Sequence, residues 1–438
     1  MKVLMFGWEF PPYISGGLGT ACYGLSKQLA KKNVGITFVL PRIKGESQLQ
    51  AAHDIRIIDG HNYLCEEIEE FRKKTSFFEK EISVNSPLRP YISYETYKEY
   101  LEKVKKFEKD SVLKMVHSYH GNFSIDFSGD YGEDLLSEVG RFAMIGRYLS
   151  QKEDFDVIHA HDWMTFLAGV EAKNQSKKPL IVHVHATEID RCGEHGNQEI
   201  FNLEKYGMEK ADKIIAVSNR TKDIIVQHYR INPNKVYVVH NGVDMEDTCY
   251  YDRNTRPFKD DKIVLYLGRI TMQKGPDYFL EAANLVLQRI QNVRFVMAGS
   301  GDMTRKLIER MATLRIADRF HFTGFLGKSD REKLFAMSDL YIMPSVSEPF
   351  GITPLEAMRY NIPVIISKQS GVAELLTNVL KVDFWDVHRL ASTIINILEK
   401  PQLKNSLTEN NWEILKKMDW GIAAQKVLQI YQECVLAA

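Results

Sequence analysis

Two cations follow one short apolar segment in the second half of the chain. Residues 263–268 are apolar and β-branched and predict a buried strand; Arg269 comes next, and Lys274 five residues later, just before a helix that begins near Pro276. At the carboxyl end of a parallel strand, such a pair can converge on one diphosphate, the arginine through two hydrogen bonds and the lysine as a point charge. The alternative for the pair alone is two solvated side chains in a loop.

Two carboxylates flank a predicted helix start further along. Glu348 lies in the loop, and Glu356 about one turn inside the helix that follows Gly351. Free backbone amides at this helix start would face the same place; they belong to Phe350, Gly351, Ile352 and Thr353. Carboxylates beside a phosphate repel it unless they accept hydrogen bonds from hydroxyls, so we expect sugar and ribose hydroxyls as partners. A glycosidase acid and nucleophile is the competing interpretation, but no water-activating arrangement accompanies the pair.

Glycines mark a strand end in the first half. Gly16 and Gly17 follow the predicted strand 2–7 and open an amphipathic helix, where backbone amides can bind an anion; a plain glycine turn is the alternative. A dinucleotide fingerprint is excluded because Cys22 stands where its third glycine would be.

Histidines end two more predicted strands. Strand alternation places His159 and His161 on a common face of their strand, and His183 and His185 on a common face of theirs. Such clusters raise a metal hypothesis, but no HExxH or related pattern is complete, so we expect polar groups facing a ligand and no metal. Buried structural histidines remain the alternative.

Composition narrows the class of protein. The 438 residues include 57 Lys+Arg and 57 Asp+Glu, so no global charge attracts nucleic acid or a membrane surface. The five cysteines are scattered without a CxxC pair, which argues against a disulfide framework. No segment reads as a signal peptide or membrane span, and we expect a cytoplasmic protein whose oligomeric state stays open.

β-Branched runs alternate with amphipathic stretches along the whole chain. This alternation predicts an α/β fold with two doubly wound, Rossmann-like domains. The expected strands are 2–7, 36–40, 55–58, 157–161, 180–185, 213–217, 236–240, 263–268, 294–299, 320–323, 340–343, 364–367 and 380–382.

Domain boundaries follow from the polar stretch 246–261, which is the best linker. We expect an N-terminal domain over 1–250, with a helical insertion at about 60–120, and a C-terminal domain over 251–438. The last helix, about 420–436, either caps the second domain or crosses back to the first.

As a set, these residues resemble the GT-B retaining glycosyltransferases, and most closely the glycogen/starch synthases in a short archaeal-type form. The segments that carry the resemblance are WEFPP at 8–12, SGGLG at 15–19, HAHDW at 159–163, HNGVD at 240–244, GRI at 268–270, QKG at 273–275, and EPFG at 348–351 with Glu356. The resemblance covers roughly 1–42, 155–245 and 262–380, and it implies two domains with a deep cleft between them.

The resemblance also implies roles. Arg269 and Lys274 would bind the diphosphate of the donor. Glu348 would lie at the glucosyl ring and Glu356 at the ribose hydroxyls, while His161 would face the sugar near its reacting carbon. Further donor-binding or supporting contacts would come from Gly16, Gly17, Asp162, Asn241 and residues 350–353.

The implied reaction transfers glucose from ADP-glucose or UDP-glucose to the non-reducing 4-hydroxyl of an α-1,4-glucan, with retention and without metal or cofactor. Two residues depart from the family pattern and leave the donor base and the acceptor open. Ile14 stands where bacterial and plant members carry lysine, and Glu356 stands where they commonly carry tyrosine. A transferase with a small acceptor, of the sucrose, trehalose or glycolipid type, is therefore the alternative. A non-catalytic glucan-binding protein is the second alternative.

Overall fold

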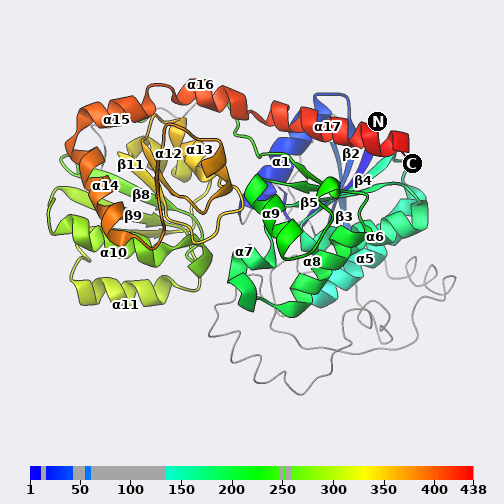
Figure 1. Cartoon of the computed structure of the whole chain (residues 1–438), viewed down its shortest axis with the longest axis horizontal. Coiled ribbons are helices and arrows are strands. Elements are labelled where there is room, and N and C mark those ends of the chain that lie inside the picture. Colours follow the sequence, from blue (N-terminus) through cyan, green and yellow to red (C-terminus); the bar gives the residue numbers. More distant parts are fainter. Residues whose placement is uncertain are drawn as a thin grey trace, which may run out of the picture. The chain divides into compact units, whose positions relative to one another are not determined.

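The computed structural model describes residues 1–10, 16–42, 55–60, 135–245, 251, 256 and 258–437. Nearly all of the insertion expected at 60–120, Ile14, and much of the linker expected at 246–261 lie outside the described residues. The chain divides into two compact units: unit 1 is Met1–Gly242 with Trp420–Ala438, and unit 2 is Val243–Asp419 (Figure 1).

Unit 1 is built on a seven-stranded parallel sheet with the order β3-β2-β1-β4-β5-β6-β7. Its strands are β1 Lys2–Phe6, β2 Gly35–Leu40, β3 Ile55–Asp59, β4 Val157–His161, β5 Leu180–Val184, β6 Lys213–Ala216 and β7 Val236–Val238. The chain builds the sheet outward from β1 in one direction and then from β4 in the other. Beyond the carboxyl ends of β1 and β4 this change of direction leaves a crevice, where ligands bind in doubly wound sheets.

Unit 2 repeats the plan with six parallel strands in the order β10-β9-β8-β11-β12-β13, so its change of direction falls between β8 and β11. Its strands are β8 Lys262–Leu267, β9 Val293–Ala298, β10 Phe320–Gly324, β11 Leu340–Met343, β12 Val364–Ser367 and β13 Leu380–Val382. All thirteen expected strands are present, each with ends within two residues of the prediction, and the α/β class with two doubly wound sheets is confirmed.

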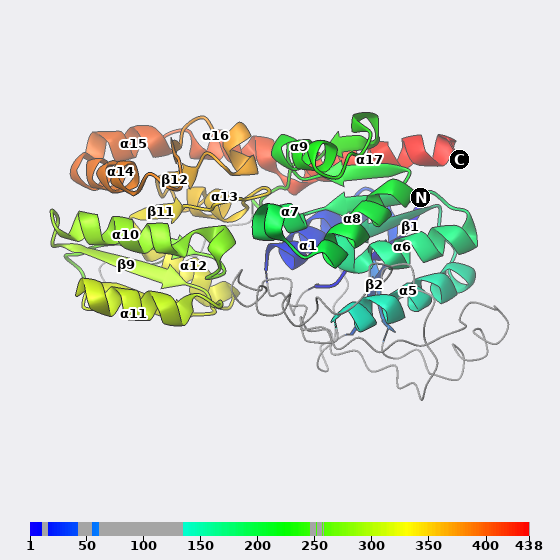
Figure 2. The same ribbon diagram turned by 60° about the horizontal axis from the view of Figure 1, so that its bottom comes forward.

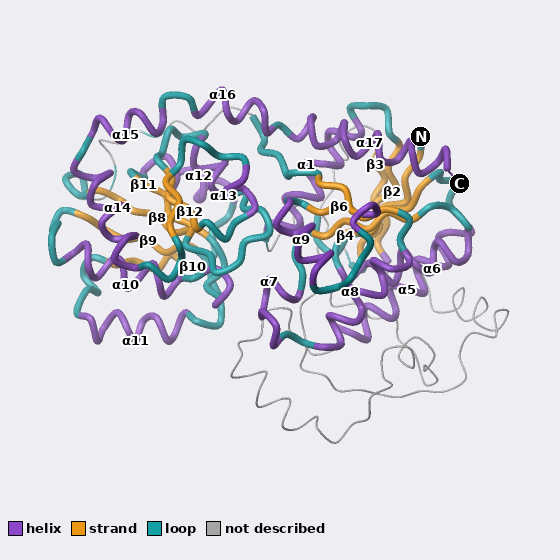
Figure 3. The backbone as a smooth tube through the Cα atoms, viewed as in Figure 1, coloured by secondary structure: helices purple, strands orange, loops and turns teal. Residues whose placement is uncertain are grey.

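Helices enclose each sheet, and Figure 3 shows the strands of each unit lying between them. In unit 1 they are α1 Gly17–Ala30, α5 Leu135–Lys152, α6 Trp163–Ser176, α7 Glu188–Cys192, α8 Gln198–Lys210, α9 Asn219–Gln227 and α17 Trp420–Ala437. In unit 2 they are α10 Pro276–Leu287, α11 Thr304–Leu314, α12 Lys328–Met337, α13 Thr353–Met358, α14 Val387–Glu399, α15 Pro401–Thr408 and α16 Asn411–Leu415. Helix α6 packs on both α5 and α8, and α10 packs on both α11 and α14 (Figure 2).

The final helix, α17, packs on α1 and β4 of unit 1. The indole of Trp420 lies so close to Gly24 that a Cβ at this glycine would stand 2.4 Å from the ring. Unit 2 begins at Val243, which forms a parallel bridge with Asp419 and whose amide donates to the carbonyl of Met418 at 2.8 Å. Among the described residues, no helix combines the length and apolarity that crossing a bilayer requires.

Candidate active site

The carboxyl edge of the unit 2 sheet brings Lys274 and Glu348 together. Lys274 ends the short 3₁₀ turn Met272–Lys274 after β8, and Glu348 lies in the loop after β11. The Nζ of Lys274 donates to Oε2 of Glu348 at 2.5 Å, and the Ser345 hydroxyl donates to the same oxygen at 3.3 Å. Both charged side chains are largely buried, with 20% and 9% of their surfaces exposed. Burial of this kind strengthens the Coulomb attraction between the two charges, while their desolvation opposes it.

A close backbone approach holds these two loops against each other. Gly275 has φ +62°, and a Cβ there would stand 2.1 Å from the carbonyl oxygen of Pro344. The amide of Val346 donates to the carbonyl of Gln273 at 2.9 Å. Only glycine fits a position that combines a left-handed backbone with such a contact. Gln273, the first residue of the QKG segment, is buried and joins the two loops through its backbone.

Arg269 leaves β8 beside a glycine-lined loop. Gly299 has φ +137°, and a Cβ there would stand 1.9 Å from the carbonyl oxygen of Gly268, while one on Gly301 would stand 2.2 Å from that of Ile270. The hydroxyl of Tyr266 donates to the carbonyl of Arg269 at 2.7 Å. The two glycines therefore let the loop after β9 lie directly against the backbone around Arg269.

The loop that carries Glu348 is held by its neighbour after β12. The carbonyl of Glu348 accepts from the amide of Gly371 at 2.9 Å, and that of Phe350 accepts from the amide of Val372 at 2.8 Å. Gly351 has φ +101°, which turns the chain toward Ile352, the N-cap of α13. The backbone is thus fixed from both sides, and the position of the Glu348 carboxylate follows from it.

Helix α13 places Glu356 and Thr353. Glu356 lies in the first turn, as the sequence predicted, and its Oε1 is 3.5 Å from Nη2 of Arg331 on α12. The Thr353 hydroxyl accepts from the buried hydroxyl of Tyr341 at 2.8 Å. Arg331 is a partner that the sequence did not reveal, because it lies on another helix and in no recognisable motif.

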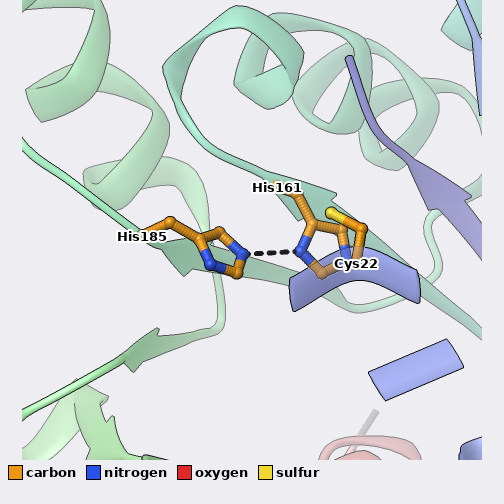
Figure 4. A group of neighbouring side chains, drawn as sticks. All are labelled: Cys22, His161 and His185. Atoms are coloured by element: carbon orange, nitrogen blue, oxygen red, sulfur yellow. Dashed lines mark hydrogen bonds between the residues drawn. The ribbon is translucent and has the colours of Figure 1, made fainter. Parts of the chain in front are cut away.

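In unit 1 the ends of β4 and β5 gather four histidines. The rings of His159 and His161 stack with centroids 4.2 Å apart, and so do those of His183 and His185. The shared faces expected from strand alternation are therefore confirmed. Nδ1 of His161 and Nε2 of His185 are 2.9 Å apart (Figure 4).

Burial determines the charge of these rings. It lowers the pKa of His159 and of His185 to about 3, and it holds the pKa of His161 and of His183 well below the usual value. At neutral pH all four imidazoles are uncharged. His161 therefore offers a ligand a neutral hydrogen-bonding group and not a cation.

Asp162 ties the two strand ends together. It has φ +62°, an uncommon conformation for a residue other than glycine, and its Oδ1 accepts from the amides of His185 at 2.6 Å and Ala186 at 3.3 Å. Burial raises the pKa of this carboxyl to about 6, although the guanidinium of Arg191 opposes the shift. Asp162 is thus a structural support for the histidine cluster.

The backbone of the two glycines at the start of α1 is not covered by neighbouring described atoms on the side where a Cβ would project. Gly16 is the N-cap of α1 and Gly17 its first residue, and a Cβ on either would meet no described atom within 4 Å. One turn on, the amide of Gly19 donates to the buried carboxylate of Glu9 at 3.3 Å. Asn241 follows β7 and is buried.

The predicted residues therefore form two groups, one at the carboxyl edge of each sheet. The unit 2 group comprises Arg269, Lys274, Glu348, Phe350, Gly351, Ile352, Thr353 and Glu356. The unit 1 group comprises Gly16, Gly17, His161, Asp162 and Asn241. Tyr431, which the sequence did not indicate, also lies at the unit 1 group. Its hydroxyl is 2.5 Å from Nδ1 of His159, although 272 positions separate the two residues in sequence.

Two family models match the chain, "Glycosyl transferases group 1" over residues 251–413 and "Glycosyltransferase Family 4" over residues 132–247. The chain is 24% identical to an uncharacterized glycosyltransferase of Methanocaldococcus jannaschii, over 99% of this chain and 98% of that protein. It is 23% identical to a glycogen synthase of Mycobacterium tuberculosis, over 98% of this chain and 94% of that one.

Solved structures share the fold at low identity. Sucrose-phosphate synthase from Thermosynechococcus elongatus superposes with a TM-score of 0.73 at 18% identity, covering 100% of both chains. HepE from Anabaena, solved in complex with UDP-glucose, gives 0.69 at 18% identity over 99% of this chain and 100% of that one. The chain is therefore a glycosyltransferase with the GT-B fold, in which a family 4 segment is followed by a group 1 segment.

Proposed function

We propose that the protein transfers glucose, with retention, from ADP-glucose or UDP-glucose to the non-reducing 4-hydroxyl of an α-1,4-glucan. The observation that carries the proposal is the group at the carboxyl edge of the unit 2 sheet, where Lys274 and Glu348 pair beside the end of β8 that carries Arg269. Two cations and a hydroxyl-accepting carboxylate at a change of strand direction suit a nucleotide sugar, which combines a diphosphate with hydroxyls.

The cations act on the leaving group. As the bond between the anomeric carbon and the diphosphate oxygen breaks, negative charge grows on the diphosphate. Arg269, Lys274 and the backbone amides of residues 350–353 then stabilise the transition state more than the ground state. Such contacts act in a partly buried site, where they are stronger than in water.

The carboxylates act on the donor's hydroxyls. Glu348 is held by two loops and by Lys274, so it is positioned to accept hydrogen bonds from the glucosyl ring. Glu356, beside Arg331, is assigned to the ribose hydroxyls. Held by fixed backbone, these groups orient the donor at little entropic cost during reaction.

His161 is assigned to the sugar near its reacting carbon. Because burial keeps the pKa of its imidazole far below neutral, the ring is a neutral positioning group or a dipole facing the positively charged sugar. We favour a front-side path in which the departing phosphate accepts the proton of the acceptor hydroxyl. A double displacement would need a nucleophilic carboxylate on the other face of the sugar.

A small acceptor is the second candidate, and the carboxylate at position 356 favours it. One experiment separates the candidates: the protein is incubated with labelled ADP-glucose and UDP-glucose, with and without glycogen. We expect label in polymer from one donor and only with glycogen. Label in a small glycoside would support the second candidate, and binding of glycogen without any transfer would indicate a non-catalytic glucan-binding protein.

A further inference from the structure

Three side chains from separate elements of unit 1 converge beside the histidine stack. Cys22 comes from α1, His161 from the end of β4 and His185 from the loop after β5 (Figure 4). Each offers one ligand atom, and these atoms all lie within 4.8 Å of one another. We propose that Cys22, His161 and His185 form a binding site for a borderline divalent metal such as Zn²⁺.

The spacing is close to what such a metal requires. Tetrahedral zinc with bonds of about 2.0–2.1 Å to nitrogen and about 2.3 Å to sulfur sets its ligand atoms about 3.3–3.6 Å apart. The facing nitrogens of His161 and His185, at 2.9 Å, would move apart slightly, and the Cys22 sulfur, within 4.8 Å of the ligand nitrogens, would move closer to them. Side-chain torsions alone can supply both movements.

The ligand types select the metal. One sulfur and two imidazole nitrogens suit zinc, cobalt or copper, whereas magnesium and calcium prefer oxygen. The imidazoles are uncharged, so each has a lone pair for the metal. Burial, together with the carboxylates of Asp162 and Glu9, raises the pKa of the Cys22 thiol well above its usual value, so the thiolate forms when the metal displaces the proton.

The ring nitrogens that face away from the proposed metal can carry the hydrogens of the neutral imidazoles. Among the described residues, Nε2 of His161, Nδ1 of His185 and both nitrogens of His183 are buried without a hydrogen-bond partner. Nδ1 of His161 and Nε2 of His185, the nitrogens that would bind the metal, face each other at 2.9 Å, so one of them carries a hydrogen that must move to the outer nitrogen of its ring before both lone pairs can bind. His185 is only partly buried and offers the way in.

Binding of the metal releases one proton. The thiol of Cys22 gives its proton to solvent and becomes the thiolate ligand, while the two neutral imidazoles bind through their lone pairs. Three protein ligands leave one position of a tetrahedral metal for water. If His161 contacts the donor sugar, which rests on the proposed function, the metal would occupy that histidine and inhibit transfer.

Cobalt supplies a direct test, because a thiolate bound to Co²⁺ gives a near-ultraviolet charge-transfer band that does not depend on activity. Metal-free full-length protein is titrated with Co²⁺ and then with Zn²⁺. We expect one Co²⁺ per chain with this band, and its loss when Zn²⁺ displaces cobalt. Cys22→Ala should abolish the band and weaken binding at least about 100-fold, with Cys22→Ser as a second variant should the first fold poorly.

Cys434→Ala is the matched control, since Cys434 is also a buried free thiol of unit 1 and lies outside the cluster. It should keep the charge-transfer band. A wild-type protein without the band, or a Cys22→Ala protein that retains it, would overturn the proposal. Transfer by Cys22→Ala without metal should match wild type and lose its inhibition by Zn²⁺. If the protein binds cobalt but shows no transfer activity, the metal site is supported and the proposed function is contradicted.

Discussion

The Nζ of Lys274 and Oε2 of Glu348 are 2.5 Å apart although 74 positions separate them in sequence. The pair joins a residue assigned to the diphosphate with one assigned to the sugar. A donor that bridges them would use the lysine as a cation and the glutamate as an acceptor. Under the proposed function, the two side chains hold each other at the place assigned to both halves of the nucleotide sugar.

Lys274→Ala should lower turnover far more than stability. Loss of one electrostatic contact to a charge that grows in the transition state typically costs about 10²–10³ in rate, or roughly 3–4 kcal/mol. Steady-state kinetics with the preferred donor measure the effect. Lys368→Ala is the matched control, because Lys368 pairs with Asp383 on the exposed surface of the same unit and should react at the wild-type rate. Unchanged turnover in Lys274→Ala would remove the diphosphate assignment.

Glu356→Gln should weaken donor binding more than it slows the chemical step. Hydrogen bonds to a charged acceptor are worth about 1.5–3 kcal/mol, so KM for the nucleotide sugar should rise about 10- to 100-fold while kcat changes little. Glu309→Gln, at an exposed i,i+4 pair with Arg305, provides the control. An equal fall in kcat with constant KM would place Glu356 at the reacting centre and not at the ribose.

Gly275→Ala should destabilise unit 2. Its φ of +62° strains any larger residue by about 1–3 kcal/mol, and the new Cβ would collide with the carbonyl of Pro344 at 2.1 Å. Urea unfolding should show a lower midpoint. Gly327→Ala should not lower the midpoint, because Gly327 has an ordinary backbone conformation and no described atom lies within 4 Å of its added Cβ. A Gly275→Ala protein as stable as wild type would contradict the tight loop contact.

Glu204 should make the stability of unit 1 depend on pH. Burial raises the pKa of its carboxyl from 4.5 to about 8, and Arg191, the cation beside it, is shared with Asp162 and Glu188. Folding therefore takes up a proton in this range. The contribution of Glu204 to stability is complete below about pH 4.5 and is lost as the pH rises through about 8.

Glu204→Gln copies the protonated form and should flatten that decline. Its free energy of unfolding relative to wild type should be higher at pH 8 than at pH 5. Glu209→Gln, on the exposed side of the same helix, should follow the wild-type profile. The same pH slope in Glu204→Gln and wild type would show that Glu204 is ionised in the folded protein.

Much of the site could be predicted because its signals are local. Arg269 follows β8 after Gly268, and Asp162 follows β4 directly, so both residues were expected at the carboxyl ends of parallel strands. Lys274 lies in the turn before α10 and Glu356 in the first turn of α13, as their spacing from the predicted helix starts indicated. Gly351 marked the start of α13 through a backbone conformation that few other residues adopt.

The remaining features depended on pairings that leave no local trace. The sequence around Lys274 does not indicate that Glu348 is its partner, and the sequence around His159 does not indicate Tyr431. The destination of α17 was likewise open, since its apolar face suited either domain.

The sequence by itself thus determined the strands, the helices and the residues that end them, because steric and hydrophobic preferences act within a few residues. Only the tertiary structure decided the strand order, the stacking of four histidines and the convergence of Cys22 with His161 and His185. These features come from packing between distant segments, whose free energy is realised only when whole elements meet.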